Sequence, residues 1–509
     1  MVDTWDTTMP FICQVVVEVL YLLALVGLFL YGLNAYIMLA LHWRNGRRRP
    51  EHTTPGPPAV WPMVTVQLPL YNERYVARRL LKAVGAIDYP IDRLEIQLLD
   101  DSTDETTDIL HEAVRELRGR GLTVVHRWRQ ERTGFKAGAL AAGLEEARGE
   151  YVAIFDADFL PPPDFLRKTI PYFADPRVAV VQSRWDHLNR DFSLLTIAQS
   201  FGIDGHFGVE QSARSWGNLF LNFNGTAGVW RKTAIRDAGG WAADTLTEDL
   251  DLSYRAQLRG WRIVYLPELA CPAELPVLIT GFKSQQCRWA KGSLQTAVKI
   301  LPTLLRAPLP AWVKYQAFMH LTYYMVHPLL LTVTLLSIPV FELQGQGLST
   351  PLSWVVGLAC SLVTLAPLSM LVYAQYVLHP HWWRRIWQLP SIMLIGIGVA
   401  LSTSFAVLGA FWGRDREFVR TPKFGIRSEG GTWLGKAYVD RRPWTGVLEI
   451  GLGLYSAWAI WYAWQQEQYG VLPFFALYST GFLSVGVLTI LHSTVRGVSS
   501  LSTVEADHP

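Results

Sequence analysis

The chain has 509 residues, of which half are hydrophobic and 17% are charged, and its formal net charge is +3. This length allows two or three domains, and so small a net charge gives no reason to expect a nucleic-acid partner. The four cysteines lack Cys-x-x-Cys spacing, so neither a zinc site nor a disulfide framework is indicated. The apolar run after Phe11 exceeds a signal-peptide core, so no cleavable signal is expected.

Charged residues are concentrated between about 45 and 310, whereas 11–42 and most of 316–493 are apolar. This division predicts an integral membrane protein that carries one soluble domain. The first apolar stretch begins without Lys or Arg and is followed by HWRNGRRRP. The positive-inside rule therefore predicts that the N-terminus lies outside and the soluble domain lies in the cytoplasm. The plasma (inner) membrane is the expected location.

The soluble block alternates short apolar runs with helical patterns. Strands are expected at 64–68, 94–99, 123–126 and 151–155, with helices from about 73, from about 104 and over 136–147. This βαβ periodicity predicts a twisted parallel sheet. The remaining pattern predicts a strand and a long amphipathic helix over 182–216, a glycine-rich turn into a strand at 222–232, and a strand at 262–266.

Three of the predicted strands end in polar or acidic loops. Glu73 follows the first, Asp100 and Asp101 follow the second, and Asp156 and Asp158 follow the strand at 151–155. Two carboxylates one residue apart repel each other unless a cation lies between them, and oxygen ligands favour Mg²⁺ or Mn²⁺. An Asp-x-Asp motif by itself fits a solvent-exposed loop with hydrated charges as well as it fits a cation site. Because ligands bind outside the carboxyl ends of such strands, the convergence of the loops favours a functional site.

The segment TLTEDLD at 245–251 is expected to open a helix. Thr245 and Glu248 fit a capping box, and acidic residues favour a helix N-terminus. One carboxylate of Glu248 and Asp249 is also placed to act as general base for a hydroxyl nucleophile. The pattern leaves both roles open.

A basic helix is expected at 280–305, near the membrane surface. Within its QQCRW segment, Arg288 suits phosphate oxygens and Trp289 offers a flat face to a sugar or base. The same helix would equally suit anionic lipid headgroups. Lys136 is a second phosphate candidate, with a solvated surface position as the alternative. No GxxxxGK[ST] motif is present, so nothing suggests an ATPase.

Further apolar segments lie at 316–341, 352–378, 389–412, 445–464 and 472–492. The loop 413–443 is rich in Lys and Arg and should be cytoplasmic, but it would lie outside if every apolar segment spanned the membrane. The segment 389–412, rich in small and hydroxyl residues, is therefore expected to be an interfacial or re-entrant helix, which leaves five spans. A sixth span with an exception to the charge rule is the alternative.

The motifs VQLPLYNE, LLDDSTDET, KAGAL, FDADF, FNGTAG, TEDLD and QQCRW occur in this order, followed by FVRTPK. In order and spacing they resemble the processive family 2 glycosyltransferases, the group of cellulose, mannan and hyaluronan synthases. FVRTPK is similar to the gating loop of that family. The segments LPLYNE, DDSTDET, FDADFLP and FNGTAGVWR are most similar to the cellulose-synthase-like mannan and glucomannan synthases.

The resemblance implies a GT-A fold, which is an α/β, Rossmann-like glycosyltransferase domain, inserted here between transmembrane helices. Together with the hydropathy pattern it predicts, in chain order, a transmembrane helix 1–45, a Pro-rich linker 46–62, a cytoplasmic GT-A domain 63–275, amphipathic interface helices 276–312, two transmembrane helices 313–380, the interfacial or re-entrant helix 381–412, a gating-type loop 413–443, two transmembrane helices 444–495 and a tail 496–509.

The resemblance also implies an inverting, metal-dependent transfer of a hexose from a nucleotide sugar to the end of a growing β-linked polysaccharide. GDP-mannose is the favoured donor, UDP-glucose is the alternative, and Mg²⁺ or Mn²⁺ is the implied cofactor. A non-processive hexosyltransferase with a lipid acceptor remains an open alternative. A transporter or channel with a regulatory soluble domain is disfavoured by the converging acidic loops and by the lack of a ladder of paired intramembrane charges.

Carried over by motif, the resemblance assigns roles to individual residues. Asp249 would be the base, beside Glu248, and Asp156 and Asp158 would hold the diphosphate and its metal. The other implied substrate-binding residues are Asp100 or Asp101 for the nucleoside, Glu73 beside them, Lys136 for the departing diphosphate, Asn224, Gly225 and Thr226 for the acceptor, Gln285, Arg288 and Trp289 for the diphosphate and terminal sugar, and Thr421 and Lys423 for closure over the nucleotide.

Overall fold

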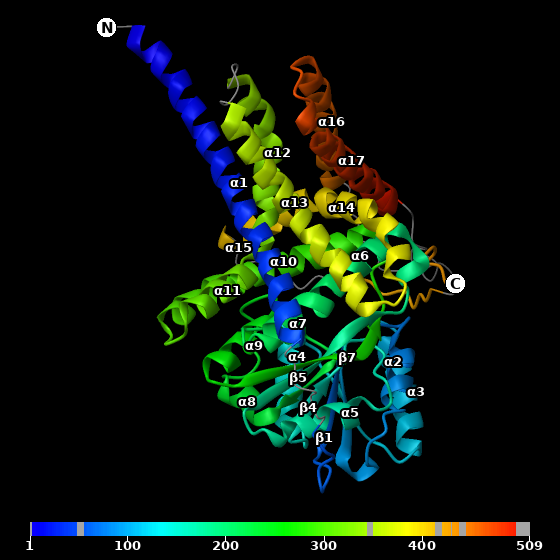
Figure 1. Ribbon diagram of the computed structural model, residues 1–509. Helices are drawn as coiled ribbons and strands as arrows, with labels where there is room; N and C mark the ends of the chain where they lie inside the picture. The colour runs from blue at the N-terminus through cyan, green and yellow to red at the C-terminus, as the bar shows by residue number, and fades with distance from the viewer. Residues whose placement is uncertain are drawn as a thin grey trace, which may run out of the picture.

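The computed structural model describes residues 3–47, 55–343, 350–412, 420–428, 430–436 and 444–494. In chain order a mixed α/β domain follows a long N-terminal helix and precedes a group of C-terminal helices, and in space these helices lie together on one side of the domain (Figure 1). Parts of the predicted linker (48–54) and gating-type loop (413–419, 429 and 437–443), and the tail from 495 onward, lie outside the described residues.

The domain is organised around a seven-stranded sheet with strand order β3-β2-β1-β4-β6-β5-β7. Its strands are β1 Val64–Leu70, β2 Leu94–Asp100, β3 Thr123–Trp128, β4 Tyr151–Ile154, β5 Val178–His187, β6 Gly228–Arg231 and β7 Arg262–Ala273. β1 pairs in parallel with β2 and β4, and β2 pairs in parallel with β3, as the βαβ periodicity predicts.

The prediction of a wholly parallel sheet is wrong, because β6 runs antiparallel to both β4 and β5. After β5 the chain forms α6 (Leu194–Gly205), a π-turn (His206–Glu210) and α7 (Gln211–Trp216), which lie between the carboxyl ends of the strands and the C-terminal helices (Figure 1). The next strand therefore enters the sheet from the carboxyl edge. The glycine-rich turn before β6 is thereby placed at the same edge as the loops after β1, β2 and β4.

Helices cover both faces of the sheet, as its buried strands require. One core lies under α2 (Ala77–Val84) and α3 (Thr106–Gly119), and the other lies under α4 (Phe135–Glu146) and α9 (Glu248–Leu258). Successive residues around β4 enter opposite cores: Ala153 and Phe155 join the first, and Val152 and Ile154 join the second. The next residue along, Asp156, leaves the sheet at its carboxyl edge.

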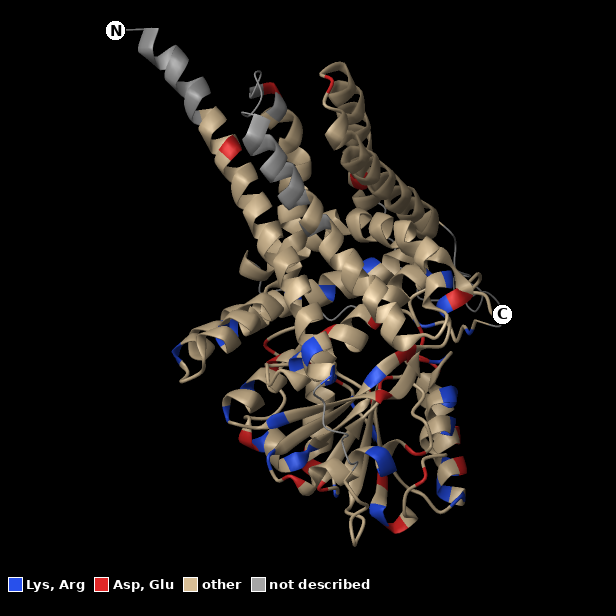
Figure 2. Ribbon diagram, viewed as in Figure 1, with Lys and Arg blue, Asp and Glu red and all other residues tan. Residues whose placement is uncertain are grey.

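Two helices lie across the top of the sheet, α10 (Ile279–Arg306) and α11 (Ala311–Leu321), and the upright helices rise from them (Figure 1). The upright group contains α1 (Asp3–Arg47), α12 (Val326–Leu343), α13 (Thr350–Leu378), α16 (Trp444–Gln465) and α17 (Leu472–Thr494). Charged residues cluster in the sheet domain and near α10, whereas the upright helices carry few (Figure 2).

Several apolar helices could cross a membrane. Within the described residues, three are long and apolar enough, namely Cys13–Arg47, Tyr323–Val340 and Tyr469–Thr494. A fourth candidate is the pair Trp382–Gly398 and Ala400–Trp412, which contains α14 (Leu389–Gly398) and α15 (Ala400–Trp412) and is bent by 43°. The five spans, and the interfacial or re-entrant position of 389–412, stay predictions.

Candidate active site

A cavity of about 160 Å³ lies at the carboxyl edge of the sheet, beneath α10. All the residues that the motifs single out line this cavity except Asp100 and Thr226. The lining residues among them are Glu73, Asp101, Lys136, Asp156, Asp158, Asn224, Gly225, Glu248, Asp249, Gln285, Arg288, Trp289, Thr421 and Lys423. One site therefore collects segments that are up to 350 positions apart in the chain.

The structure distinguishes the two aspartates that follow β2. Asp101 lines the cavity and receives two hydrogen bonds from the Arg129 guanidinium, at 2.7 and 2.6 Å. Asp100 is fully buried, where its Oδ2 accepts from Thr107 Oγ1 at 2.9 Å and lies 3.0 Å from His126 Nε2. Burial raises the pKa of Asp100, but hydrogen bonds, first that of His126, outweigh burial and lower it. Asp100 thus holds the loop, and Asp101 faces the cavity.

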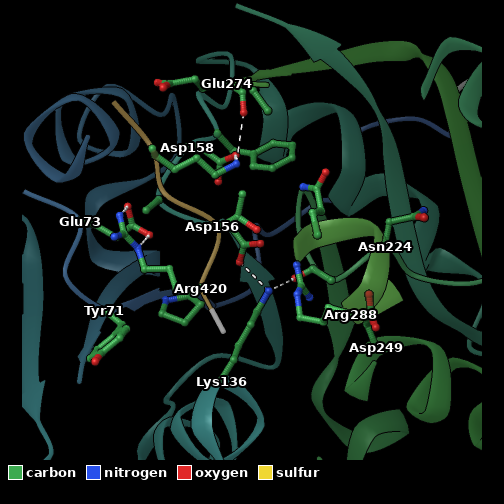
Figure 3. A pocket seen from close by; sticks show the side chains of 18 of the residues that line it. Tyr71, Glu73, Lys136, Asp156, Asp158, Asn224, Asp249, Glu274, Arg288 and Arg420 are labelled. Carbon is green, nitrogen blue, oxygen red and sulfur yellow. Dashed lines mark hydrogen bonds and ion pairs between the residues drawn. The ribbon is translucent and has the colours of Figure 1, made fainter. Parts of the chain in front are cut away.

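Each aspartate of the Asp156-Ala157-Asp158 segment forms an ion pair with a different lysine. Lys136 Nζ lies 2.5 Å from Asp156 Oδ1, and Lys423 Nζ lies 2.5 Å from Asp158 Oδ2. Lys136 rises from the start of α4 toward Asp156 (Figure 3). Thr226 is buried behind this segment, and its Oγ1 accepts a hydrogen bond from the backbone nitrogen of Asp156 at 2.8 Å. Thr226 therefore positions Asp156 and does not line the cavity.

The two carboxylates suit a divalent ion that is shared with a phosphate group. No cluster of three or more His, Cys, Asp or Glu that could hold an ion occurs among the described residues. Mg²⁺ in phosphate-binding sites typically takes one or two protein carboxylates and completes its shell with phosphate oxygens and water. Asp156 and Asp158 line one cavity, and one third of the Asp156 side chain is exposed. This donor set fits an ion that arrives with a diphosphate.

The capping box that the sequence of Thr245 and Glu248 would fit is not formed. Helix α9 begins at Glu248, and Thr247 is its N-cap and makes no side-chain capping bond. The helix thus starts two residues too late for Thr245 to cap it, and Thr245 Oγ1 is buried without a hydrogen-bond partner among the described residues. Glu248 and Asp249 instead both line the cavity.

The surroundings of Asp249 shift the pKa of its carboxyl toward neutrality. Burial, followed by the charge of Glu248, raises the pKa of Asp249 to about 7, although Lys136 opposes this shift. Lys136 Nζ lies 4.0 Å from Glu248 Oε1. Burial lowers the pKa of Lys136, but the carboxylates around it, first Asp156, outweigh burial and raise it. A carboxylate that titrates near neutrality suits the removal of a hydroxyl proton.

Gly225 lies against the Asp249 carboxylate and the Lys136 ammonium. Its φ is +79°, and its carbonyl accepts a hydrogen bond from Lys136 Nζ at 2.9 Å. A Cβ at this position would lie 2.9 Å from Asp249 Oδ2 and 3.5 Å from Lys136 Nζ. Both the backbone conformation and the close approach therefore require glycine here.

Replacement of Gly225 by alanine should lower turnover about 10²-fold, because a displacement of about 1 Å at a reacting group has an effect of that size. Gly240→Ala is the matched control, since Gly240 has φ +76° but an added Cβ would meet nothing within 4 Å. The control should cost about 1–2 kcal/mol of stability, from the left-handed backbone alone, and retain its turnover. Steady-state rates and thermal unfolding of both variants test this; equal rates would contradict the contact with Asp249.

The described part of the loop that resembles the gating loop covers the cavity. Arg420 makes two hydrogen bonds to the Glu73 carboxylate, at 2.8 and 2.6 Å, on the side of the cavity opposite Arg288 (Figure 3). The backbone nitrogen of Phe424 donates to Glu274 Oε1 at 2.8 Å. Glu73, which the resemblance assigns to substrate binding, therefore also holds this loop. Thr421 lines the cavity, and its buried Oγ1 makes no hydrogen bond with the described residues.

The wall of the cavity to which the resemblance assigns the acceptor is formed by α10 and by the turn before β6. Trp289 lies near Trp185 of β5, with ring centroids 6.5 Å apart. Asn224 lines the cavity, but its Oδ1 lies 3.0 Å from His206 Nε2 and accepts from Asn222 Nδ2 at 2.9 Å. Its carbonyl oxygen is therefore already engaged by neighbouring side chains.

Several cavity residues were not identified from sequence patterns. Arg132 stacks on the Tyr71 ring, with its guanidinium carbon 3.3 Å from the ring centroid. Tyr71 lies within the motif PLYNE and Arg420 lies within FVRTPK, whereas Arg132 lies shortly before KAGAL. Position in or next to a motif is the signal that could have found them. Trp185 and Glu274 belong to no motif and carry none.

The sequence model of the family described as "Glycosyltransferase like family 2" matches residues 62–292. Residues 62–292 form a family 2 glycosyltransferase domain. A glucomannan 4-beta-mannosyltransferase from Arabidopsis thaliana is 44% identical to the chain over 251 residues, which cover 48% of this chain and 47% of that relative. A second, from Oryza sativa subsp. japonica, is 43% identical over 256 residues and covers 49% of each. The chain spans about half the length of these relatives.

The glycosyltransferase domain has the GT-A fold. A mannosyltransferase from Pyrobaculum calidifontis, whose structure contains GDP-Man and Mn²⁺, superposes with a TM-score of 0.51. The match covers 77% of this chain and 99% of the other, at 23% sequence identity. At this identity the comparison bears on the fold alone.

Proposed function

We propose that the chain is a membrane-embedded inverting glycosyltransferase that transfers mannose from GDP-mannose to the end of a growing β-linked mannan or glucomannan. The observation that carries this proposal is the geometry around Asp249, a buried carboxylate with a raised pKa beside Lys136 and beneath α10. The identity of 43–44% with glucomannan mannosyltransferases over the glycosyltransferase domain supports the sugar. UDP-glucose is the alternative donor.

In this proposal Asp249 removes the proton from the acceptor hydroxyl, which attacks the anomeric carbon from the face opposite the diphosphate. Direct displacement inverts the anomeric centre, so that an α-linked donor yields a β-linkage. Trp289 and Trp185 offer flat faces to the terminal sugar of the acceptor. Arg288 lies on the same wall of the cavity as Asp249 (Figure 3), and there its charge stabilises the departing diphosphate.

On the donor side, Asp101 would bind the nucleoside. The Thr421 hydroxyl, which makes no hydrogen bond with the described residues, supports closure of the loop over the nucleotide. Asp156 and Asp158 would hold Mg²⁺ or Mn²⁺ with the diphosphate. A bound divalent ion would supply Lewis-acid stabilisation of the leaving group. Lys136 and Lys423 already lie beside these carboxylates, where their charges are close to the expected position of the phosphates.

We further propose that the sheet domain lies in the cytoplasm and that the N-terminus lies outside, at the plasma or inner membrane. The basic residues in the last turn of α1, Arg44 and Arg47, and the few charges on the upright helices support this orientation (Figure 2). The bilayer and the extending polysaccharide would then be the partners of the chain, and the organisation into spans, interface helices and gating-type loop predicted above belongs to the same proposal.

One observation favours a second candidate, a hexosyltransferase with a lipid acceptor. An apolar cavity of about 570 Å³ lies between α1, α10, α11 and α12. Leu294 of α10 lines it little more than one helical turn beyond Trp289, and Val298 lines it about one turn further along. An acyl or prenyl chain in this cavity would place its polar end toward the active site.

The deciding experiment measures donor turnover by the purified protein in detergent, with Mg²⁺ or Mn²⁺, and with GDP-mannose, UDP-glucose or both. A β-mannanase-sensitive polymer from GDP-mannose is the expected product. Formation of only a lipid-extractable monoglycoside would favour the second candidate. Absence of transfer from either donor would refute the proposed function.

A further inference from the structure

The helix that carries the QQCRW residues, α10, is joined to α16 and α17 by a buried ion pair. Lys283 of α10, with 7% of its side chain exposed, places its Nζ 2.6 Å from Glu449 Oε1 of α16. The same nitrogen lies 2.9 Å from Thr445 Oγ1 and 3.2 Å from Thr489 Oγ1. Each of the three ammonium hydrogens therefore has an acceptor on α16 or α17.

A second contact holds the first turn of α10. The backbone nitrogen of Ile279 donates to His492 Nδ1 of α17 at 3.1 Å, whereas the N-cap, Leu278, makes no side-chain capping bond. The first N–H groups of a helix have no partner within the helix, so His492 supplies one from another helix. Trp433, from the loop that covers the cavity, packs on His492 with ring centroids 5.5 Å apart.

The helices α16 and α17 form a tightly packed antiparallel pair, so they present these contacts as one unit. A Cβ on Gly446 would lie 2.9 Å from Gly486 O, and one on Gly453 would lie 2.6 Å from Leu483 Cγ. Small residues let helix backbones approach closely in apolar surroundings. Neither helix can therefore shift far without the other.

The part of α10 that follows the QQCRW segment is anchored to the residues just before Glu248 and Asp249. A Cβ on Gly292 would lie 2.6 Å from the Thr247 side chain, and Gln295 Oε1 accepts from the backbone nitrogen of Leu246 at 3.0 Å. The cavity residues of α10 thus lie between two anchors. One anchor is the start of α9, and the other is the α16–α17 pair.

We propose that Lys283 is a positioning residue and that the α16–α17 pair sets the position of α10 over Asp249 through Lys283–Glu449 and His492–Ile279. The inference rests on the proposed glycosyltransferase function. An apolar pair could join the helices without desolvating two charges, so an ion pair with three acceptors at this place fixes the register of α10. Loss of the pair lets the acceptor side of the cavity move relative to Asp249, while the donor side stays on the sheet.

The test compares Lys283→Met and Glu449→Gln with the unmodified protein. Both variants should lower kcat about 10²-fold and leave the KM for the nucleotide sugar within about twofold. Asp101, Asp156 and Asp158 follow strands of the sheet, and Arg288 of α10 acts on the departing diphosphate, so its displacement should affect kcat more than KM. Lys314→Met is the matched control, since Lys314 is a partly exposed lysine on α11 whose Nζ donates to the carbonyl of Leu305 at 2.8 Å. The exchanged pair Lys283→Glu with Glu449→Lys should recover part of the turnover.

Hydrogen exchange followed by mass spectrometry gives a readout that does not depend on catalysis. Amides over 279–288 should exchange faster in both single variants, and amides of β1 and β4 should not. The double variant Lys283→Met with Glu449→Leu removes both charges, so no unpaired charge is left buried and the protein should fold. The turnover of this double variant should stay low.

Unchanged kcat in the single variants, or full turnover in that apolar double variant, would overturn the proposal. A parallel rise in donor KM with faster exchange across the sheet would also overturn it, because it would indicate general destabilisation. If the unmodified protein transfers no sugar, the proposed function fails, but the exchange pattern still decides whether the α16–α17 pair holds α10.

Discussion

Asp249→Asn should abolish most glycosyl transfer, with kcat falling about 10²–10⁴-fold, because a positioned general base contributes an effect of that size. The amide keeps the shape of the carboxylate but takes up no proton. In the unmodified protein, kcat/KM should rise with pH up to about 7, the pKa to which burial and Glu248 raise Asp249. Rates measured across a pH series test this, and the residual activity of the variant should lack the acid limb.

Two controls separate this role from a structural one. Asp244→Asn changes a half-exposed aspartate of the same segment, paired with Lys299, and should keep turnover. Glu248→Gln should move the acid limb to lower pH, because the charge of Glu248 raises the pKa of Asp249. An acid limb that persists in Asp249→Asn would assign the base to another group.

The same shift has a consequence for stability. Because the folded pKa of Asp249 lies above the usual aspartate value, the native state binds more protons than the unfolded state between that value and about 7. The contribution of Asp249 to stability therefore falls as pH rises through this window. Asp249→Asn should accordingly unfold at a temperature no lower than the unmodified protein at about pH 8.

Lys136→Met should both slow transfer and shift its pH dependence. Lys136 lowers the pKa of Asp249, so its loss should move the acid limb above pH 7. The substitution also removes a positive charge 2.5 Å from Asp156, where the diphosphate is expected. The loss of one such stabilising group lowers kcat about 10²-fold. The pH profile distinguishes these two effects, because only the first moves the limb.

Lys168→Met is the matched control for Lys136→Met. Lys168 is also paired with a carboxylate, Asp164, but both side chains are about half exposed. Exposed pairs of this kind contribute little, so rate and profile should be unchanged. A Lys136 variant with normal turnover and an acid limb still near 7 would refute the role assigned to this lysine.

The sequence by itself determined the strands β1 to β4 and the edge at which their loops meet. Uninterrupted apolar runs that end in acidic residues, separated by helical patterns, leave few arrangements other than a sheet with its polar loops at the carboxyl edge. Asp156 was therefore expected beside Asp100 and Asp101 before any contact was known, and the resemblance implied that Asp249 belongs to the same site. The order and spacing of the motifs pointed to the same GT-A fold.

Only the tertiary structure decided which neighbour each side chain meets. The pattern did not distinguish Asp100 from Asp101, because the two aspartates are adjacent and have the same local composition. They differ in the direction in which their side chains leave the end of β2, one into the protein and the other into the cavity. Nor did it predict the antiparallel β6, whose direction depends on where α6 and α7 return the chain to the sheet.

The ion pairs Arg420–Glu73 and Lys283–Glu449 join residues 347 and 166 positions apart. Periodicity constrains neighbours within an element, and a motif constrains the few residues that it contains. Neither constrains which charge meets which across the fold, because that depends on the packing of whole helices against the sheet. The sequence therefore predicted the chemistry available at the site, and the packing of the helices determined how it is held.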